Sequence, residues 1–329
     1  MNADGAELGA RRQPRLERHR RLIMLAQAVL VPAGLAGIAW AAVRHADSIA
    51  PTGSTAYLIG ALCTLQLSLL VFARRLHASL ATMGISVPVA LSMRIALQSL
   101  FYFFFIPFST GAELSRWAKI KAAVPESPNL AVLTAVGFDR AMPAVACLAI
   151  SLASLPFVTM RGVRVTDATA LPVHPVIAVA VLAVVTGGAA AVAVRRGWIA
   201  RILELLRAGG RRFMRGIVVV GVASIAVQLL SIATMWLLAR WLGIEIGFAA
   251  LALGTSGGML AQVIPISLAG AGAAELGSGL LFAACGATTS EAVVLTTALY
   301  LCKLVGAVEG GILEFPLSRL RGAIGRNAG

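Results

Sequence analysis

Apolar runs of about twenty residues recur along the whole chain, and this feature constrains the fold more than any other. At about 1.5 Å of rise per helical residue, each such run can cross a hydrocarbon core about 30 Å thick. Strand-period alternation is absent, so helices rather than a barrel must satisfy the backbone in lipid. We therefore predict an all-α polytopic membrane protein. Its candidate apolar segments are 22–43, 54–73, 87–106, 130–157, 174–194, 216–239, 246–264, 273–287 and 291–314.

The charge distribution supports the same class. Charged residues make up 13% of the chain, against roughly 25% in soluble domains. The net charge of +14 comes from basic residues that cluster between the apolar runs and at both termini. This pattern is typical of cytoplasmic loops beside anionic headgroups, rather than of nucleic-acid binding. The four cysteines and four histidines lack metal-ligand spacing, so we expect no metal, no cofactor and no nucleic-acid partner.

The basic loops predict an orientation in which both termini are cytoplasmic. Segment 1–21, the pair Arg74 and Arg75, and the tail 316–329 are all basic, and each is placed inside by the positive-inside rule. Residues 116–121 are basic too, so the broken run between 87 and 115 must enter the membrane from the cytoplasmic side and return to it. Counting crossings in the second half likewise requires residues 246–287 to begin and end outside. They therefore form a second hairpin, which enters from the opposite side.

Each half of the chain then consists of span, span, broken hairpin and span. We predict two inverted-topology repeats, at 22–157 and 174–315, with about six full spans and two broken re-entrant hairpins in total. Inverted repeats with interrupted helices at matching positions are typical of transporters whose substrate site lies near the membrane midplane.

Two similar motifs interrupt the hairpins: FIPFSTGAELSRW at 105–117 and VIPISLAGAGAAELG at 263–277. A proline removes a backbone donor, glycines permit turns, and a hydroxyl side chain can cap the helix that restarts. A restarting helix presents free N–H groups and the positive end of its dipole, which suit a phosphate. The break residues are Pro107, Ser109 and Gly111 in the first motif, and Pro265, Ser267, Gly270 and Gly272 in the second.

Charged residues near or within the apolar segments are the candidates for chemistry. Each would cost roughly 2.5–3.5 kcal/mol at the bilayer centre, so each must find a partner, face water or bind a charged ligand. Adjacent Asp139 and Arg140 point about 100° apart on a helix and need partners from other segments. We expect the cations to bind phosphate and the carboxylates to balance charge or couple to protons. The cations are Arg116, Arg140 and Lys303, and the carboxylates are Glu113, Asp139, Glu275 and Glu309.

The helix periodicity and the proposed repeat suggest specific relations among these charges. Glu113 and Arg116 are spaced i,i+3 and can face the same way on a regular helix. Glu275 corresponds to Glu113 in the second repeat, and Lys303 lies close to the counterpart of Arg140. Separately, Gly254 to Gly258 and Gly306 to Gly310 place small residues four apart, which favours close helix packing.

Three stretches carry a family resemblance: PFSTGAELSRWAKIKA, VGFDRAM and VIPISLAGAGAAELGSGLLFAACGATTSEAV. Over roughly residues 20–320 the chain resembles the flippase-like membrane domain of lysylphosphatidylglycerol synthases and its stand-alone relatives. The resemblance implies translocation of a polar or aminoacylated lipid, or a related carrier, in a bacterial or archaeal inner membrane. Matching positions are Pro107, Gly111, Glu113, Arg116, Asp139, Arg140, Pro265, Ser267, Gly270, Gly272 and Glu275.

The chain departs from the family pattern in two respects. Its first turn is shorter, with Ser-Thr in place of another glycine or polar residue. A soluble aminoacyl-transferase domain is also missing from the sequence, so we expect no lipid aminoacylation.

We expect a flippase or scramblase-type transporter, not an enzyme, that moves a polar phospholipid or lipid-linked carrier through a central polar cavity. One alternative is a membrane enzyme for lipid-linked sugars, which would need a metal or an acid–base pair in a deep pocket. Another is a scaffold subunit for a lipid synthase, with its charges paired in a dry core. The expected partners are the lipid and the surrounding membrane, and the sequence leaves open a homo-oligomer or a partner lipid-synthesis enzyme.

Overall fold

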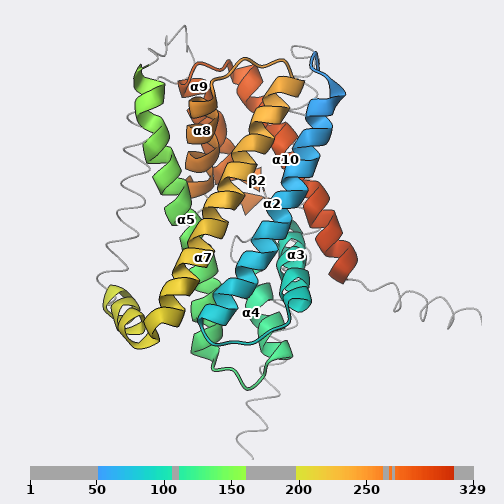
Figure 1. Ribbon diagram of the computed structural model, residues 1–329. Helices are drawn as coiled ribbons and strands as arrows, with labels where there is room; N and C mark the ends of the chain where they lie inside the picture. The colour runs from blue at the N-terminus through green and yellow to red at the C-terminus, as the bar shows by residue number, and fades with distance from the viewer. Residues whose placement is uncertain (1–50, 106–110, 161–197, 262–266, 269–270, 315–329) are drawn as a thin grey trace, which may run out of the picture.

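The structure is a computed structural model that describes residues 51–105, 111–160, 198–261, 267–268 and 271–314 (Figure 1). The described residues form a helical bundle, which confirms the predicted helical class. One antiparallel ladder of two residues per strand departs from the all-α prediction and pairs Ser267 with Gly272. The elements are α2 (Thr55–Thr82), α3 (Val89–Phe105), α4 (Gly111–Ala123), α5 (Asn129–Met160), α7 (Trp198–Trp241), α8 (Phe248–Ala261), β1 (Ser267–Leu268), β2 (Ala271–Gly272), α9 (Ala273–Ala284) and α10 (Thr289–Glu314).

Four of these helices are long and apolar enough to cross a membrane. Their spans, Thr55–Thr82, Asn129–Val158, Phe213–Trp241 and Thr289–Glu314, overlap four of the predicted segments. The predicted segments 22–43 and 174–194 lie outside the described residues. The chain is thus a helical membrane protein, while the total of six spans stays a prediction.

Two helix boundaries differ from those expected. Arg74 and Arg75, which we placed in a loop, lie within α2, because the apolar periodicity continues through buried Leu76 and Leu80. In α7, Gly210 has a φ of +52°, which only glycine adopts readily, and this turn separates the first part of α7 from its membrane-length part.

The shorter helices occupy opposite halves of the bundle (Figure 1). The four long helices run along most of its length, whereas α3 and α4 lie in the lower half and α8 and α9 in the upper half. The helices of each short pair pack against each other. Each pair also packs against a long helix from the other half of the sequence, α3 against α10 and α8 against α5. The short helices therefore join the two halves of the chain.

The most extensive helix contact in the described part of the bundle is the antiparallel seam between α2 and α7. Near its middle, the hydroxyls of Thr64 and Thr234 are hydrogen-bonded at 3.0 Å. At one end, the Gly53 N–H donates to the Trp241 carbonyl at 2.9 Å. Such hydrogen bonds and close approaches replace hydrophobic driving force between helices in lipid.

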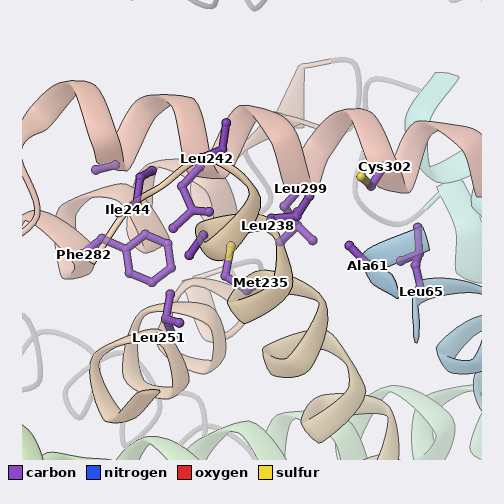
Figure 2. Close-up of a cluster of buried hydrophobic side chains, with 13 residues drawn as sticks. Ala61, Leu65, Met235, Leu238, Leu242, Ile244, Leu251, Phe282, Leu299 and Cys302 are labelled. Atoms are coloured by element: carbon purple, nitrogen blue, oxygen red, sulfur yellow. The ribbon is translucent and has the colours of Figure 1, made fainter. Parts of the chain in front are cut away.

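Apolar packing holds the bundle together around these seams. Figure 2 shows a cluster that joins α2, α7, α8, α9 and α10, while a second cluster joins α2, α3, α4 and α5. The long helices also carry large apolar side chains on the outer surface, as expected for contact with lipid tails. Examples are Leu67, Leu152, Val222 and Ile312.

Both small-residue motifs lie at close helix contacts, as their spacing predicts. A Cβ at Gly254 or Gly258 of α8 would meet Phe282 or Ser278 of α9. On α10, a Cβ at Gly310 would meet the backbone carbonyl of Leu97 in α3. A backbone atom cannot rotate away, so the α3–α10 contact requires glycine at position 310.

Substitution of Gly310 by alanine is expected to lower the free energy of unfolding by about 1–3 kcal/mol, because the added methyl group separates α3 from α10. The measurement is thermal unfolding of the purified protein in detergent. Gly137→Ala is the matched control, since a Cβ there meets nothing within 4 Å. Equal melting temperatures for the two variants would contradict the contact.

Candidate functional site

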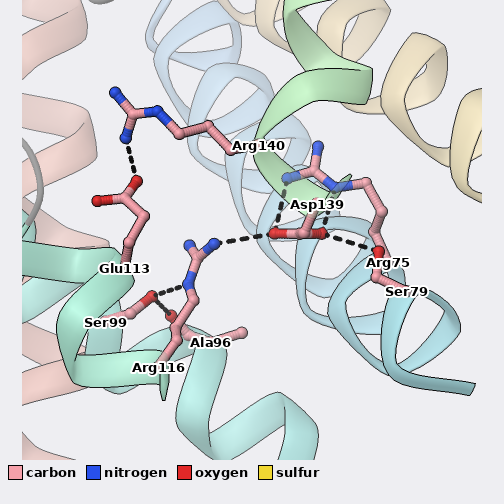
Figure 3. Close-up of polar contacts among 8 residues, drawn as sticks. All are labelled: Arg75, Ser79, Ala96, Ser99, Glu113, Arg116, Asp139 and Arg140. Carbon is pink, nitrogen blue, oxygen red and sulfur yellow. Dashed lines mark hydrogen bonds and ion pairs between the residues drawn. The ribbon is translucent and has the colours of Figure 1, made fainter. Parts of the chain in front are cut away.

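A fully buried carboxylate, Asp139 on α5, organises the charges of the first half. Its two oxygens accept from Arg75 Nε at 2.9 Å and Arg116 Nη1 at 2.8 Å, and Ser79 donates to it at 3.4 Å (Figure 3). Arg116 Nε also donates to Ser99 Oγ at 2.8 Å. This network, which we call the Asp139 triad after Arg75, Asp139 and Arg116, therefore connects α2, α4 and α5 and reaches α3 through Ser99.

The triad carries two guanidinium groups and one carboxylate, and all three side chains are buried. The excess positive charge has an aromatic neighbour, because the Phe72 ring centroid lies 5.3 Å from Arg75 Cζ and 4.9 Å from Arg116 Cζ. The electron-rich face of an aromatic ring attracts a cation at this range. The triad thus has the partners that a buried charge requires.

Arg140, the residue after Asp139, points to a different partner. It forms an ion pair with Glu113 in the first turn of α4, and the side chains are 40% and 21% exposed, respectively. The two adjacent charges therefore have separate partners from other elements, as the helix geometry requires. Glu113 and Arg116, spaced i,i+3 on α4, both contact α5, so they face the same helix as their spacing allows, and each has its own partner there.

A comparable ion pair lies in the second half. Glu275, in the first turn of α9, has its Oε1 3.9 Å from Lys303 Nζ on α10, and the side chains are 19% and 23% exposed. Both pairs thus join the second helix of a short pair to the long helix that follows it.

A small pocket adjoins the second pair and lies between α7, α8, α9 and α10. Its open space has room for about one water-sized group. It contains both charges, three hydroxyl side chains and apolar groups. We call it the Glu275 pocket, and its lining residues are Met235, Thr255, Met259, Ala274, Glu275, Ser278, Thr296, Leu299 and Lys303.

Glu309, the last predicted carboxylate, accepts from Gln66 Nε2 on α2 at 2.6 Å. The predicted break residues are only partly described. Gly111 is the buried first residue of α4, and Ser267 and Gly272 pair in the short ladder. Pro107, Ser109, Pro265 and Gly270 lie outside the described residues, so their roles stay predictions.

Sequence reasoning missed three contributors to these networks. Arg75, predicted to lie in a loop, is buried within α2, and no local sequence signal indicates this burial, because it depends on the distant Asp139. At the end of α10, Glu314 accepts from Lys119 at 2.5 Å and from Tyr102 at 2.8 Å. Lys119 and Tyr102 lie 195 and 212 residues before Glu314, and no sequence pattern joins positions so far apart, so they were not recognised as its partners.

The fold and these charges define a polytopic α-helical membrane protein in which ion pairs connect short helices to membrane-length ones. The model of the family described as the lysylphosphatidylglycerol synthase TM region matches residues 22–308. The chain therefore belongs to this family, which confirms the resemblance noted from its motifs. Neither a curated protein nor a solved structure matches the chain.

Neutralising the central carboxylate with Asp139→Asn is expected to lower the free energy of unfolding by about 3–5 kcal/mol, since it leaves two buried guanidinium groups without a counter-charge. Thermal unfolding in detergent measures the effect. Glu126→Gln removes one negative charge from an exposed position and serves as the control. If both variants unfold at the wild-type temperature, the triad is not an important stabilising element.

Proposed function

We propose that this protein translocates a polar phospholipid or lipid-linked carrier across the inner (cytoplasmic) membrane as a flippase or scramblase-type transporter. The observation that carries the proposal is the pair of partly exposed ion pairs, Glu113–Arg140 and Glu275–Lys303, in a helical membrane bundle. Membership of a family named after the membrane region of a lipid synthase supports a lipid as the substrate. The proposed protein is a transporter rather than an enzyme, and its proposed partner is the lipid.

The proposal includes two inverted repeats, 22–157 and 174–315, with six full spans and two re-entrant hairpins. Glu275 follows Glu113 by 162 residues and Lys303 follows Arg140 by 163, so both members of the two pairs correspond. The mutual packing of α3 on α10 and α8 on α5 has the reciprocity expected of a two-fold relation. The opposite placement of the short pairs in Figure 1 agrees with inversion. Cytoplasmic termini follow from the basic segments at both ends.

Arg140 is the best-suited phosphate ligand in this mechanism. Its guanidinium is the most exposed cation in the ion pairs described above, and a phosphate can take the place of the Glu113 carboxylate as its partner. Arg116 is buried against Asp139 and Ser99. We therefore assign Arg116 an indirect role: it holds α4, and with it Glu113, in position for Arg140.

Replacement of Arg140 by glutamine is expected to slow lipid movement by about 10- to 100-fold, because the variant loses one charge-assisted contact to the phosphate, which contributes about 1.5–3 kcal/mol. The measurement is transbilayer movement of labelled phospholipids in proteoliposomes. Arg74→Gln is the matched control, because Arg74 is exposed and lies on α2 next to Arg75. Unchanged movement in Arg140→Gln would refute the assigned role.

A charge exchange distinguishes ligand binding from a merely structural ion pair. The double variant Glu113→Arg with Arg140→Glu retains an ion pair, so the folded protein is expected to keep most of its stability. It places the cation on α4 instead of α5, however, and lipid movement is expected to remain slow. Full recovery of movement would mean that the pair acts only as a link between helices.

The inverted arrangement predicts that the loops after α4 and α9 lie on opposite sides of the membrane. In a variant without its four native cysteines, Glu126→Cys is expected to react with a membrane-impermeant maleimide only from the cytoplasmic side. Thr289→Cys is expected to react only from the outside. Both positions are exposed. Labelling of both cysteines from one side would exclude the inverted repeat.

A further inference from the structure

The two halves of the bundle differ in chemistry at corresponding positions. Ser278 follows Arg116 by 162 residues, and Cys302 follows Asp139 by 163, so uncharged side chains replace two members of the Asp139 triad. In the first half the triad is buried and hydrogen-bonded. In the second half Ser278 lines the Glu275 pocket instead. A partly exposed ion pair is common to both halves, and in the second half the Glu275 pocket lies beside it.

Thr255 provides an independent indication that the Glu275 pocket accepts a ligand. This α8 residue is 2% exposed and lines the pocket, and its Oγ1 has no hydrogen-bond partner among the described residues. Thr296, another lining residue, donates instead to the Ala292 carbonyl of its own helix at 2.8 Å. A buried hydroxyl without a partner costs about 1–3 kcal/mol, so a ligand that bonds to it gains that contact.

The size and charge of the pocket restrict the ligand. Room for about one water-sized group excludes a whole phosphate but admits a single hydroxyl. Glu275 and Lys303 balance each other, so a phosphate would face the carboxylate and an ammonium or metal cation would face the lysine. A hydroxyl can donate to Glu275 while it accepts from Lys303 or Thr255, and it brings no charge.

We propose that the Glu275 pocket binds a hydroxyl from the uncharged part of the lipid headgroup, such as a glycerol or sugar hydroxyl, with Thr255 as a specificity-determining residue. This inference rests on the proposed function, because it assumes that the lipid headgroup reaches the second ion pair. In this arrangement Lys303 contacts the hydroxyl, and Arg140 binds the phosphate.

The test is a binding measurement on the full chain in detergent, with short-chain lipids as ligands and the thermal shift as the readout. Dioctanoyl phosphatidylglycerol and phosphatidylmethanol carry the same phosphodiester charge, but only phosphatidylglycerol has free headgroup hydroxyls. A short-chain glucosyl diacylglycerol supplies hydroxyls without a charge. We expect phosphatidylglycerol to bind about tenfold more tightly than phosphatidylmethanol, and we expect the sugar lipid to raise the melting temperature, because its hydroxyls enter the pocket.

Thr255→Val removes the hydroxyl and keeps the shape of the side chain. We expect it to leave the ligand-free melting temperature unchanged or higher, and to abolish the difference between phosphatidylglycerol and phosphatidylmethanol. Thr255→Ser restores a hydroxyl and is expected to recover the difference. Thr134→Val is the matched control, since Thr134 lies in the first half and donates to Leu130 of its own helix.

The possible outcomes separate this inference from the transport proposal. Equal binding of the two charged lipids by the wild type, or an undiminished difference in Thr255→Val, would overturn the hydroxyl site even if Arg140 variants confirm transport. A lower ligand-free melting temperature in Thr255→Val, with the lipid difference retained, would identify Thr255 as a structural residue. Loss of the difference in Thr255→Val but not in Thr134→Val supports the site, whatever the rate of lipid movement.

Discussion

The buried carboxylate of Asp139 is the interaction on which the geometry of the first half depends. It brings together guanidinium groups from α2 and α4, and Arg116 extends the contact to α3 through Ser99. Because Arg140 follows Asp139 on a regular helix, fixing Asp139 also fixes the direction of Arg140. The partly exposed Glu113–Arg140 pair therefore owes its position to a triad that itself has almost no access to solvent.

The second half achieves a similar arrangement with apolar packing. Its short helices approach closely because Gly254 and Gly258 allow α9 to lie against α8, and Leu251 of α8 and Phe282 of α9 belong to the apolar cluster in Figure 2. Charge also distinguishes the ends of the bundle. Lys119 of α4 binds Glu314 at the end of α10, whereas α8 meets α5 through apolar residues such as Leu253 and Val158. A movement that opens the α4–α10 contact must break an ion pair, and one that opens the α5–α8 contact must expose apolar surface.

The helices were largely predictable from the sequence, because apolar length and period reflect local requirements of a chain in lipid. The motif breaks also separated α3 from α4 and α8 from α9 near the expected positions. The partners of the charges were less predictable. The i,i+3 spacing of Glu113 and Arg116 predicted that both can face the same way, but it identified no partner for either. Their partners, Asp139 and Arg140, lie on α5, and these contacts depend on the rotation and packing of helices that one sequence does not reveal.

Arg75 illustrates a more general reason for this limit. Arginines at the end of an apolar run usually lie at the membrane surface, and the prediction that Arg75 lies in a cytoplasmic loop follows from that rule. A buried carboxylate on a distant helix reverses the preference, since Asp139 supplies the counter-charge that makes burial of Arg75 tolerable. Its burial could therefore be inferred only together with that of Asp139.

The charge balance of the two halves gives the proposed substrate an orientation. In the first half, Arg75, Arg116 and Arg140 outnumber Glu113 and Asp139 by one positive charge. In the second, Glu275 and Lys303 cancel, and Glu309, which accepts from the uncharged Gln66, adds a negative charge. An anionic phosphate is therefore favoured near the first half, where it compensates an existing excess. An uncharged hydroxylated group suits the second, where any added charge would disturb a balanced pair. A headgroup with its phosphate at one end and its hydroxyls at the other matches this difference in charge between the halves. The opposite orientation of the headgroup would oppose both preferences.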